Sequence, residues 1–301
     1  MKKFIKRVVL FLILTIVPYS ITGLLTYRGE IIKLSNSESF NVKLCELHNL
    51  QNCHYDIIGI GSSMTLNNLN SKTLVSELDN TSYHNLSSWG FRIDNQLEFL
   101  PTITELYAPS TIITVSNIVD FSIGDITFSN EIIKYYIKGL QTWMLRPFYY
   151  ASFEYNRHCE EFKHSYGKYW SLDFDKYGGV NVDVTGNNIQ PERWNEKKQF
   201  NYDSTNIQYK KLEEICRYLQ SNNINYVFVQ SPTRDLYIQD SQSDYILHIQ
   251  KTKDIVTQYN HIYVMPQEIY TDSCFNDGIH LNIQGSKKLT KEIAQKIKEY
   301  L

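Results

Sequence analysis

Five short apolar runs dominate the hydrophobic pattern of this chain after its first 50 residues. The runs cover residues 55–60, 83–86, 111–115, 224–229 and 261–265. Short runs of this kind, bounded by small and polar residues, are typical of buried strands. The segments between them are long enough for helices, and strands that alternate with helices predict βαβ units with right-handed crossovers. We therefore expect an α/β protein with a mainly parallel sheet.

Several segments between these runs have the periodicity of amphipathic helices. We expect helices at residues 65–78 and 94–107, and a helical connector at residues 31–50. Two later segments have apolar faces that contain Ile207, Leu212, Ile215 and Leu219 in one, and Leu289, Ile293, Ile297 and Leu301 in the other. Polar residues occupy the opposite faces, so both helices should pack against the sheet.

The first 30 residues form a separate unit. Four basic residues lie within residues 2–7, and residues 8–27 then carry no charge over the length of one bilayer crossing. The basic flank favours a cytoplasmic N-terminus, which puts residues 31–301 outside the cytoplasm. We expect a single-pass N-terminal transmembrane helix in the cell membrane. A cleaved signal peptide is the alternative, but no A-x-A-like site follows the run; the basic start argues against a buried core helix.

Between residues 121 and 205 the alternation of strands and helices stops, and aromatic residues become frequent. We interpret this stretch as an aromatic-rich insertion in a domain of residues 31–301, which covers the edge of the sheet as a cap. Its aromatic rings either stack on sugar rings or form a small core, the commoner role. His158 and His164 lie near acidic residues, but their spacing fits no metal motif, which favours a solvated helix face.

Composition and cysteine spacing exclude several classes of function. The net charge of −2 shows no excess of basic residues of the kind that binds nucleic acid. The five cysteines form no C-x-x-C pair and no Cys/His metal spacing, so we expect no metal and no cofactor. Outside the cytoplasm, a disulfide between Cys45 and Cys53 and two separate buried thiols are equally compatible with the sequence.

Small polar residues follow the first apolar run directly. Gly61-Ser62-Ser63 lies between a predicted strand and a predicted helix. This position puts a hydroxyl on a tight turn beside backbone N–H groups that can stabilise an oxyanion. Serine is also a common helix cap, so this motif alone leaves both roles open.

A second polar motif precedes the last helix. Asp277 and His280 are three residues apart on a predicted loop. A carboxylate can hold an imidazole in one tautomer, and the imidazole can then accept a proton from a serine hydroxyl. Arg234, after the fourth run, could contact an anionic substrate group, but a surface ion pair is its commoner role.

Together, a serine after the first strand and an Asp-x-x-His before the last helix resemble the SGNH (GDSL-type) hydrolase family. The resemblance covers roughly residues 55–120 and 205–301. It implies a flavodoxin-like, three-layer α/β/α fold with five strands. It also implies a catalytic triad in which Ser63 is the nucleophile, His280 the base and Asp277 the residue that orients it.

The second block of the family supplies a glycine whose N–H joins the oxyanion hole. Residues 85–90, Asn-Leu-Ser-Ser-Trp-Gly, resemble this block. The resemblance therefore implies Gly90 as an oxyanion donor beside the N–H of Ser63.

Two positions depart from the family pattern. Ser62 stands where the family name expects Asp, although Gly-Ser-Ser versions are familiar among membrane-anchored relatives that act on cell-surface polymers. The third block is normally Gly-x-Asn-Asp, whereas residues 115–120 read Val-Ser-Asn-Ile-Val-Asp. Asn117 is the candidate for the third oxyanion donor and Ser116 is its rival. Loss of one such donor costs roughly 3 kcal/mol of transition-state stabilisation.

The resemblance implies a serine acyl-esterase that acts outside the cytoplasm on an O-acetyl or similar O-acyl ester of a cell-surface polysaccharide. Two alternatives stay open. An O-acyltransferase would use the same triad and would need a separate membrane partner as acyl donor. A non-catalytic polysaccharide-binding or assembly protein would keep the fold without turnover, and the imperfect third block favours that reading.

Overall fold

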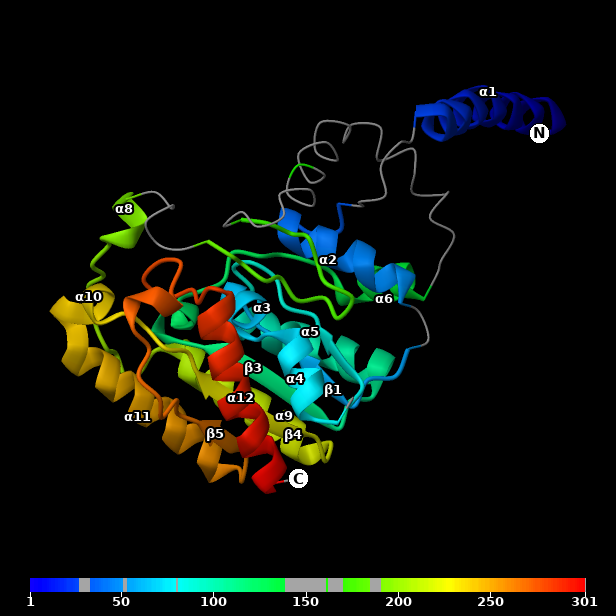
Figure 1. Ribbon diagram of the computed structural model, residues 1–301. Coiled ribbons are helices and arrows are strands. Elements are labelled where there is room, and N and C mark those ends of the chain that lie inside the picture. Colours follow the sequence, from blue (N-terminus) through cyan, green and yellow to red (C-terminus); the bar gives the residue numbers. More distant parts are fainter. Residues whose placement is uncertain are drawn as a thin grey trace.

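A computed structural model describes most of the chain, and its centre is one parallel β-sheet (Figure 1). The described residues are 1–26, 33–50, 53–79, 81–138, 161, 170–184 and 191–300. The strands are β1 (Ile57–Gly59), β2 (Tyr83–Asn85), β3 (Thr111–Ser116), β4 (Asn225–Gln230) and β5 (Ile262–Val264). They lie in the order β2-β1-β3-β4-β5, and all neighbours are parallel. The expected α/β class and five-stranded sheet are confirmed.

The helices expected at residues 94–107 and on the apolar faces that contain Ile207 and Leu289 are found, with differences at their ends, whereas the helix at residues 242–258 was not expected. Before the insertion they are α2 (Glu38–Asn49), α3 (Ser63–Asn68), α4 (Ser71–Glu77) and α5 (Ile93–Tyr107). Within and after it they are α6 (Asn130–Ile137), α8 (Pro191–Trp194), α9 (Ile207–Ser221), α10 (Asp235–Ile238), α11 (Gln242–Gln258) and α12 (Ile283–Tyr300). The described residues also form the short 3₁₀ helices η1 (Ile118–Phe121), η5 (Gln239–Ser241) and η6 (Asp272–Cys274).

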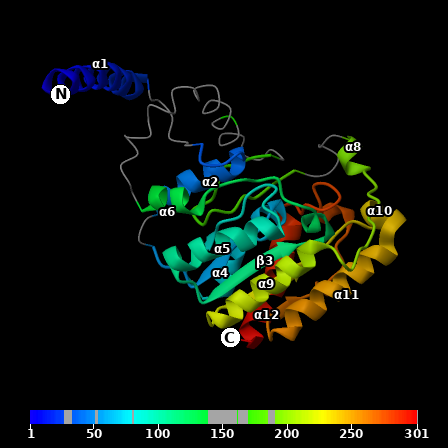
Figure 2. The same cartoon turned by 180° about the vertical axis from the view of Figure 1, so that it is seen from behind.

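Alternate residues of the strands enter two different cores. On one face, Ile58 and Ile112 pack with apolar residues of α2, α5 and α9. On the other, Ile57 and Ile113 pack with residues of α3, α4 and α12. Side chains of a strand point alternately to the two faces of its sheet, so both faces of a fully buried sheet must be apolar. Helices therefore cover both faces, an arrangement compatible with three α/β/α layers (Figure 2).

The strand order reverses direction between β1 and β3. The chain passes from β1 to its neighbour β2 on one side and then to β3 on the other side of β1. Ligand sites of open α/β sheets form at the carboxyl ends of the strands beside such a switch point. The segment Gly61-Ser62-Ser63 follows the carboxyl end of β1 and therefore lies at this position.

The helix expected at residues 65–78 is two helices. The break at Leu69–Asn70 arises because Asn70 caps α4: its Oδ1 atom accepts from the N–H of Thr73 at 3.0 Å. Its own N–H donates to Thr290 Oγ1 at 2.8 Å, which ties the break to α12. In the described part of the connector expected at residues 31–50, the helix begins at Glu38, after its N-cap Ser37.

The N-terminal segment is the helix α1 (Lys2–Thr26). Among the described residues, no helix has the length and apolar character needed to cross a membrane. The transmembrane run expected at residues 8–27 is therefore not found among them. Part of that run, residue 27 and the side chains of residues 19, 20 and 22–26, lies outside the described part of the chain.

Part of the insertion packs along the outer edge of the sheet. The N–H of Asn85 in β2 donates to Tyr177 O at 2.7 Å, and the N–H of Val180 donates to Leu66 O at 3.2 Å. Residues 170–184 thus lie beside β2 and α3. Of the aromatic residues, Tyr136 is buried and Tyr135 is exposed.

Several expectations for the insertion concern residues that the structure does not describe. Among these are His158 and His164, together with many of the aromatic residues of the segment.

The alternative of a disulfide between Cys45 and Cys53 is wrong. The structure contains no bond between these two sulfur atoms. Cys45 lies within α2 and packs with Leu66 and Val180 in a small core, whereas Cys53 follows the end of that helix and is half-buried. The alternative of separate thiols therefore holds for this pair.

Candidate active site

The turn after β1 gives its two serines different environments. Ser62 is buried and is the N-cap of α3: its Oγ atom accepts from the N–H of Met64 at 3.1 Å. Ser63 is the first residue of the helix and is partly exposed. Gly61 is required here because an added Cβ would lie 2.1 Å from Thr65 Oγ1. The turn therefore keeps one hydroxyl as a helix cap and leaves the other accessible.

The structure brings Ser63, His280 and Asp277 together in one hydrogen-bonded chain. His280 Nε2 lies 2.8 Å from Ser63 Oγ, although 217 positions separate the two residues. On the other side of the ring, His280 Nδ1 lies 2.9 Å and 3.1 Å from the two carboxylate oxygens of Asp277. Since a carboxylate only accepts, Nδ1 carries the proton, and Nε2 is the nitrogen that accepts from the serine hydroxyl.

The loop that carries His280 is held by bonds within itself. Asp277 Oδ1 accepts from the backbone N–H groups of Ile279 at 2.9 Å and His280 at 2.8 Å. A bridge joins Phe275 to Leu281 across the loop. The same carboxylate thus orients both the imidazole and the backbone beneath it.

The N–H groups of Ser63 and Gly90 are the two backbone donors expected for the oxyanion hole. The N–H of Ser63 is at the first position of α3, where no partner exists within the helix. Gly90 follows β2 with φ of +68°, a left-handed conformation that glycine adopts without strain. Its loop is tied to the nucleophile turn, because the N–H of Ser88 donates to Gly61 O at 3.0 Å. The geometry is compatible with the oxyanion roles expected for Ser63 and Gly90.

The two rivals for the third donor have different partners. Ser116 Oγ donates to Asp120 Oδ2 at 2.9 Å, so this hydroxyl is engaged. Asn117 is fully buried, and its Oδ1 atom caps η1 by accepting from the N–H of Val119 at 3.0 Å. Its Nδ2 atom lies 3.7 Å from Sδ of Met64, the residue after the expected nucleophile. Both side chains are therefore buried and bonded within the protein, and the choice of Asn117 as third donor stays a prediction.

Asp120 is a residue of the site whose role the sequence did not reveal. It is 3% exposed and receives hydrogen bonds from Ser62 and Ser116. Burial raises the pKa of Asp120 to about 6, although the two hydroxyl donors lower it. The signal in the sequence is an acid within the apolar string Ile118-Val119-Asp120-Phe121, directly after β3.

The raised pKa of Asp120 predicts a pH-dependent contribution to stability. Between about pH 4 and 6 the folded protein keeps a proton that the unfolded chain releases, so stability falls as the pH rises through this window. A pKa increase from 3.8 to about 6 corresponds to roughly 3 kcal/mol. We expect the free energy of unfolding of Asp120→Asn, relative to wild type, to increase by most of this amount between pH 4 and pH 8. Urea unfolding at both pH values measures it, and a difference that does not change with pH would contradict it.

Arg234 forms an ion pair in which its own side chain is buried and its partner, Asp272, is exposed. Its guanidinium donates to both carboxylate oxygens of Asp272, at 2.9 Å and 2.8 Å, and stacks on Trp194 at 3.5 Å. Its backbone N–H donates to Gly278 O at 2.9 Å, in the loop of the candidate triad. The backbone of Arg234 therefore helps to hold the loop of His280, and its guanidinium charge is paired with Asp272.

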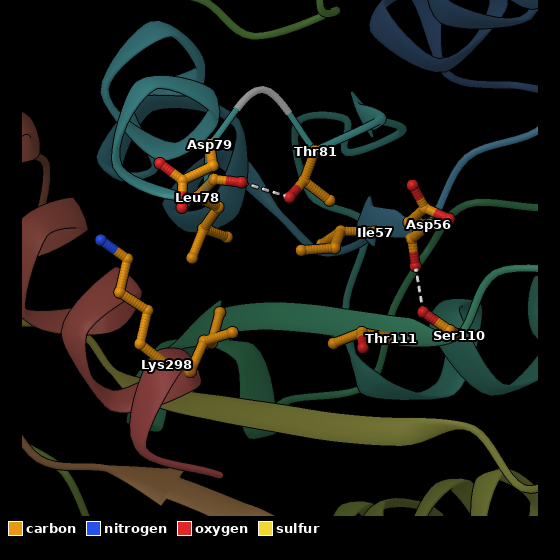
Figure 3. Close-up of a pocket in the computed structure, with 9 residues that line it drawn as sticks. Asp56, Ile57, Leu78, Asp79, Thr81, Ser110, Thr111 and Lys298 are labelled. Atoms are coloured by element: carbon orange, nitrogen blue, oxygen red, sulfur yellow. Dashed lines mark hydrogen bonds between the residues drawn. The ribbon is translucent and has the colours of Figure 1, made fainter. Parts of the chain in front are cut away.

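A separate pocket and possible metal sites were the other candidates for a functional site. A pocket of about 310 Å³ lies at the opposite edge of the sheet, where Asp56 precedes β1 and Thr111 begins β3 (Figure 3). Lys298 of α12 and Asp79 after α4 complete its rim. Within the part of the chain that the structure describes, no three His, Cys, Asp or Glu residues are grouped to hold a metal ion.

No protein-family model matches this chain, and it has no match among curated proteins. The resemblance to the SGNH family therefore rests on the sequence motifs alone.

Proposed function

We propose that this chain is a serine acyl-esterase of the SGNH type. The observation that supports it most is the chain of hydrogen bonds from Ser63 Oγ through His280 to Asp277, with distances of 2.8 Å and 2.9 Å. This arrangement makes a serine hydroxyl nucleophilic at neutral pH. Its position beside the switch point of a parallel sheet agrees with the flavodoxin-like fold of that family.

The proposed mechanism has two acyl-transfer steps. His280 Nε2 accepts the proton of Ser63 as Oγ attacks the ester carbonyl, and the imidazolium is stabilised by Asp277. The N–H groups of Ser63 and Gly90, with the amide of Asn117, stabilise the oxyanion. His280 then gives its proton to the leaving alcohol, and an acyl-serine remains. Water, activated by the same imidazole, releases the acid and restores the hydroxyl.

The proposed substrate is an O-acetyl or similar O-acyl ester of a cell-surface polysaccharide. Support comes from the resemblance to membrane-anchored relatives with a Gly-Ser-Ser turn and from the aromatic-rich insertion. The described part of that insertion, residues 170–184, packs on the edge of the sheet at β2 and α3, close to the helix that Ser63 begins.

We also propose that α1 attaches the protein to a membrane, with the remaining domain outside the cytoplasm. Its large apolar side chains are solvent-exposed, including Phe11 at 65% and Leu14 at 63%. Exposed apolar surface of this extent is typical of a segment that contacts lipid or another protein. Alkaline extraction of membranes from cells that express the chain tests this proposal, and release into the soluble fraction would count against it.

Labelling with a fluorophosphonate probe tests the nucleophile. We expect the wild type and Ser62→Ala to be labelled and Ser63→Ala to remain unlabelled, because the hydroxyl of Ser62 is buried and engaged as a cap. Labelling of Ser63→Ala, or loss of labelling only in Ser62→Ala, would reassign the nucleophile.

The products of a chromogenic acetyl ester, with and without an oligosaccharide acceptor, distinguish the reactions open to an acyl-serine. Free acetate in both cases supports the esterase. Acetylated oligosaccharide would instead identify a transferase, since hydrolysis and transfer differ only in the group that attacks the acyl-enzyme. Neither product, with no labelling at Ser63, would refute both enzymes and leave a binding role.

A further inference from the structure

Asn68 ends the helix that Ser63 begins, and its side chain contacts the backbone on both sides of His280. Its Nδ2 atom donates to Ile279 O at 3.1 Å. Its Oδ1 atom accepts from the N–H of Leu281 at 2.8 Å. One carboxamide therefore holds the residue before and the residue after the imidazole.

The same carboxamide reaches a third element. Asn68 Nδ2 donates to Ser231 Oγ at 2.8 Å, and the N–H of Ser231 donates to Ser116 O at the end of β3. Asn68 is 0% exposed, and its donors and acceptor are all directed at protein groups. Its role is therefore internal to the site and does not consist of binding a ligand.

The contacts of Asn68 fix the position of the His280 loop relative to α3, which the contacts of Asp277 leave open. Asp277 lies in the same loop as His280 and orients the ring relative to that loop. It does not fix the loop relative to α3, which carries Ser63. A displacement of about 1 Å between reacting groups can cost on the order of 10²-fold in rate. Asn68 belongs to α3 and its side chain bonds to Ile279 and Leu281, so it fixes the His280 loop at one position relative to Ser63.

We propose that Asn68 is a positioning residue, which sets the imidazole of His280 against the hydroxyl of Ser63 by holding Ile279 and Leu281. This inference rests on the proposed acyl-serine chemistry. It predicts that loss of the carboxamide slows the chemical step without removing any group that touches the substrate.

The first test is the rate constant of fluorophosphonate labelling in the full-length Asn68→Ala variant. We expect a decrease of about 10²-fold, while the final extent of labelling, which counts folded molecules, stays at the wild-type value. The matched control is Asn70→Ala. Asn70 is also buried and bonds to Thr73, Thr290 and Asn181, but not to the loop of His280. Its variant should lose stability and keep the wild-type rate constant.

A merely structural role for Asn68 would give a different result. Both variants would then lower the extent of labelling or the melting temperature and leave the rate constant unchanged, and the proposal would be overturned. If Asn68→Ala does not fold, Asn68→Asp replaces it. The aspartate keeps the volume and the acceptor for Leu281 N–H but loses, when ionised, the donor to Ile279 O, so a slower rate constant is again expected.

The ¹⁵N signals of the His280 ring provide a readout that needs no catalysis. We expect Asn68→Ala to shift these signals and Asn70→Ala to leave them in place. If the wild type is labelled at Ser63 but Asn68→Ala keeps both the rate constant and the signals, the positioning role alone fails. If the wild type is not labelled but the signals of Asn68→Ala shift, the proposed function fails and the structural coupling stands.

Discussion

Replacement of His280 by alanine should lower the rate of ester turnover by about 10⁶-fold, close to the loss expected for Ser63→Ala. The reason is that the imidazole is the only group seen within hydrogen-bond distance of Ser63 Oγ among the described residues, at 2.8 Å. Without it the hydroxyl has no base. Asp277→Asn should cost less, about 10⁴-fold, because it disturbs the tautomer and stabilisation of the ring but leaves the base in place. Steady-state hydrolysis of an acetyl ester measures these rates.

The double variant Ser63→Ala/His280→Ala provides the control for this prediction. Residues that act as one unit give losses that do not add, so the double variant should be no slower than Ser63→Ala alone. A further large loss in the double variant would mean that His280 acts independently of Ser63. Residual turnover in all variants should reflect the oxyanion donors and substrate binding.

Lys43→Ala should lower the free energy of unfolding by about 3–5 kcal/mol, the largest effect on stability that we expect. Lys43 is 0% exposed, and its Nζ atom donates to Glu46 at 2.7 Å, Asn85 O at 3.0 Å and Gly178 O at 2.6 Å. It also lies 3.6 Å from the ring centre of Phe174. The alanine variant would leave a half-buried carboxylate and two carbonyl groups without their donor.

Lys296→Ala is the matched control for Lys43→Ala. Lys296 also pairs with a glutamate three residues on, Glu299, at 2.8 Å, but both side chains are exposed. Equal losses in the two variants, measured by urea unfolding, would show that burial of Lys43 contributes nothing. Since Lys43 joins α2 to β2 and to the segment around Gly178, its loss should also expose residues 170–184 to proteolysis.

The site divides into residues that the sequence could reveal and residues that it could not. Ser63, Asp277 and His280 stand at positions where local pattern is informative: the end of an apolar run, and a short polar loop before an amphipathic helix. Asn68 carries no such signal, and the only local sign of Asp120 is its place as an acid within an apolar string. Their roles come from contacts with residues that are distant in the sequence, such as the bond from Asn68 to Leu281, 213 positions away.

The helices show the same division. The amphipathic periodicity placed α5, α9 and α12 well, because one apolar face per helix is a strong local signal. It did not reveal that residues 65–78 form two helices, since the break depends on the cap by Asn70 and on Thr290 of α12. It also gave no reason to expect a charged residue, Lys43, in the interior.

By itself the sequence determined the five strands, the parallel α/β class and the three residues of the candidate triad, because hydrophobic periodicity and short motifs are local properties of the chain. Only the tertiary structure decided that Ser62 is the helix cap and that the hydroxyl of Ser116 donates to Asp120. It also decided that the side-chain amide of Asn68 holds the loop of His280. These depend on distances between segments that meet only after folding. A buried polar group must find its hydrogen-bond partner wherever the fold places one, and that partner can lie anywhere in the chain.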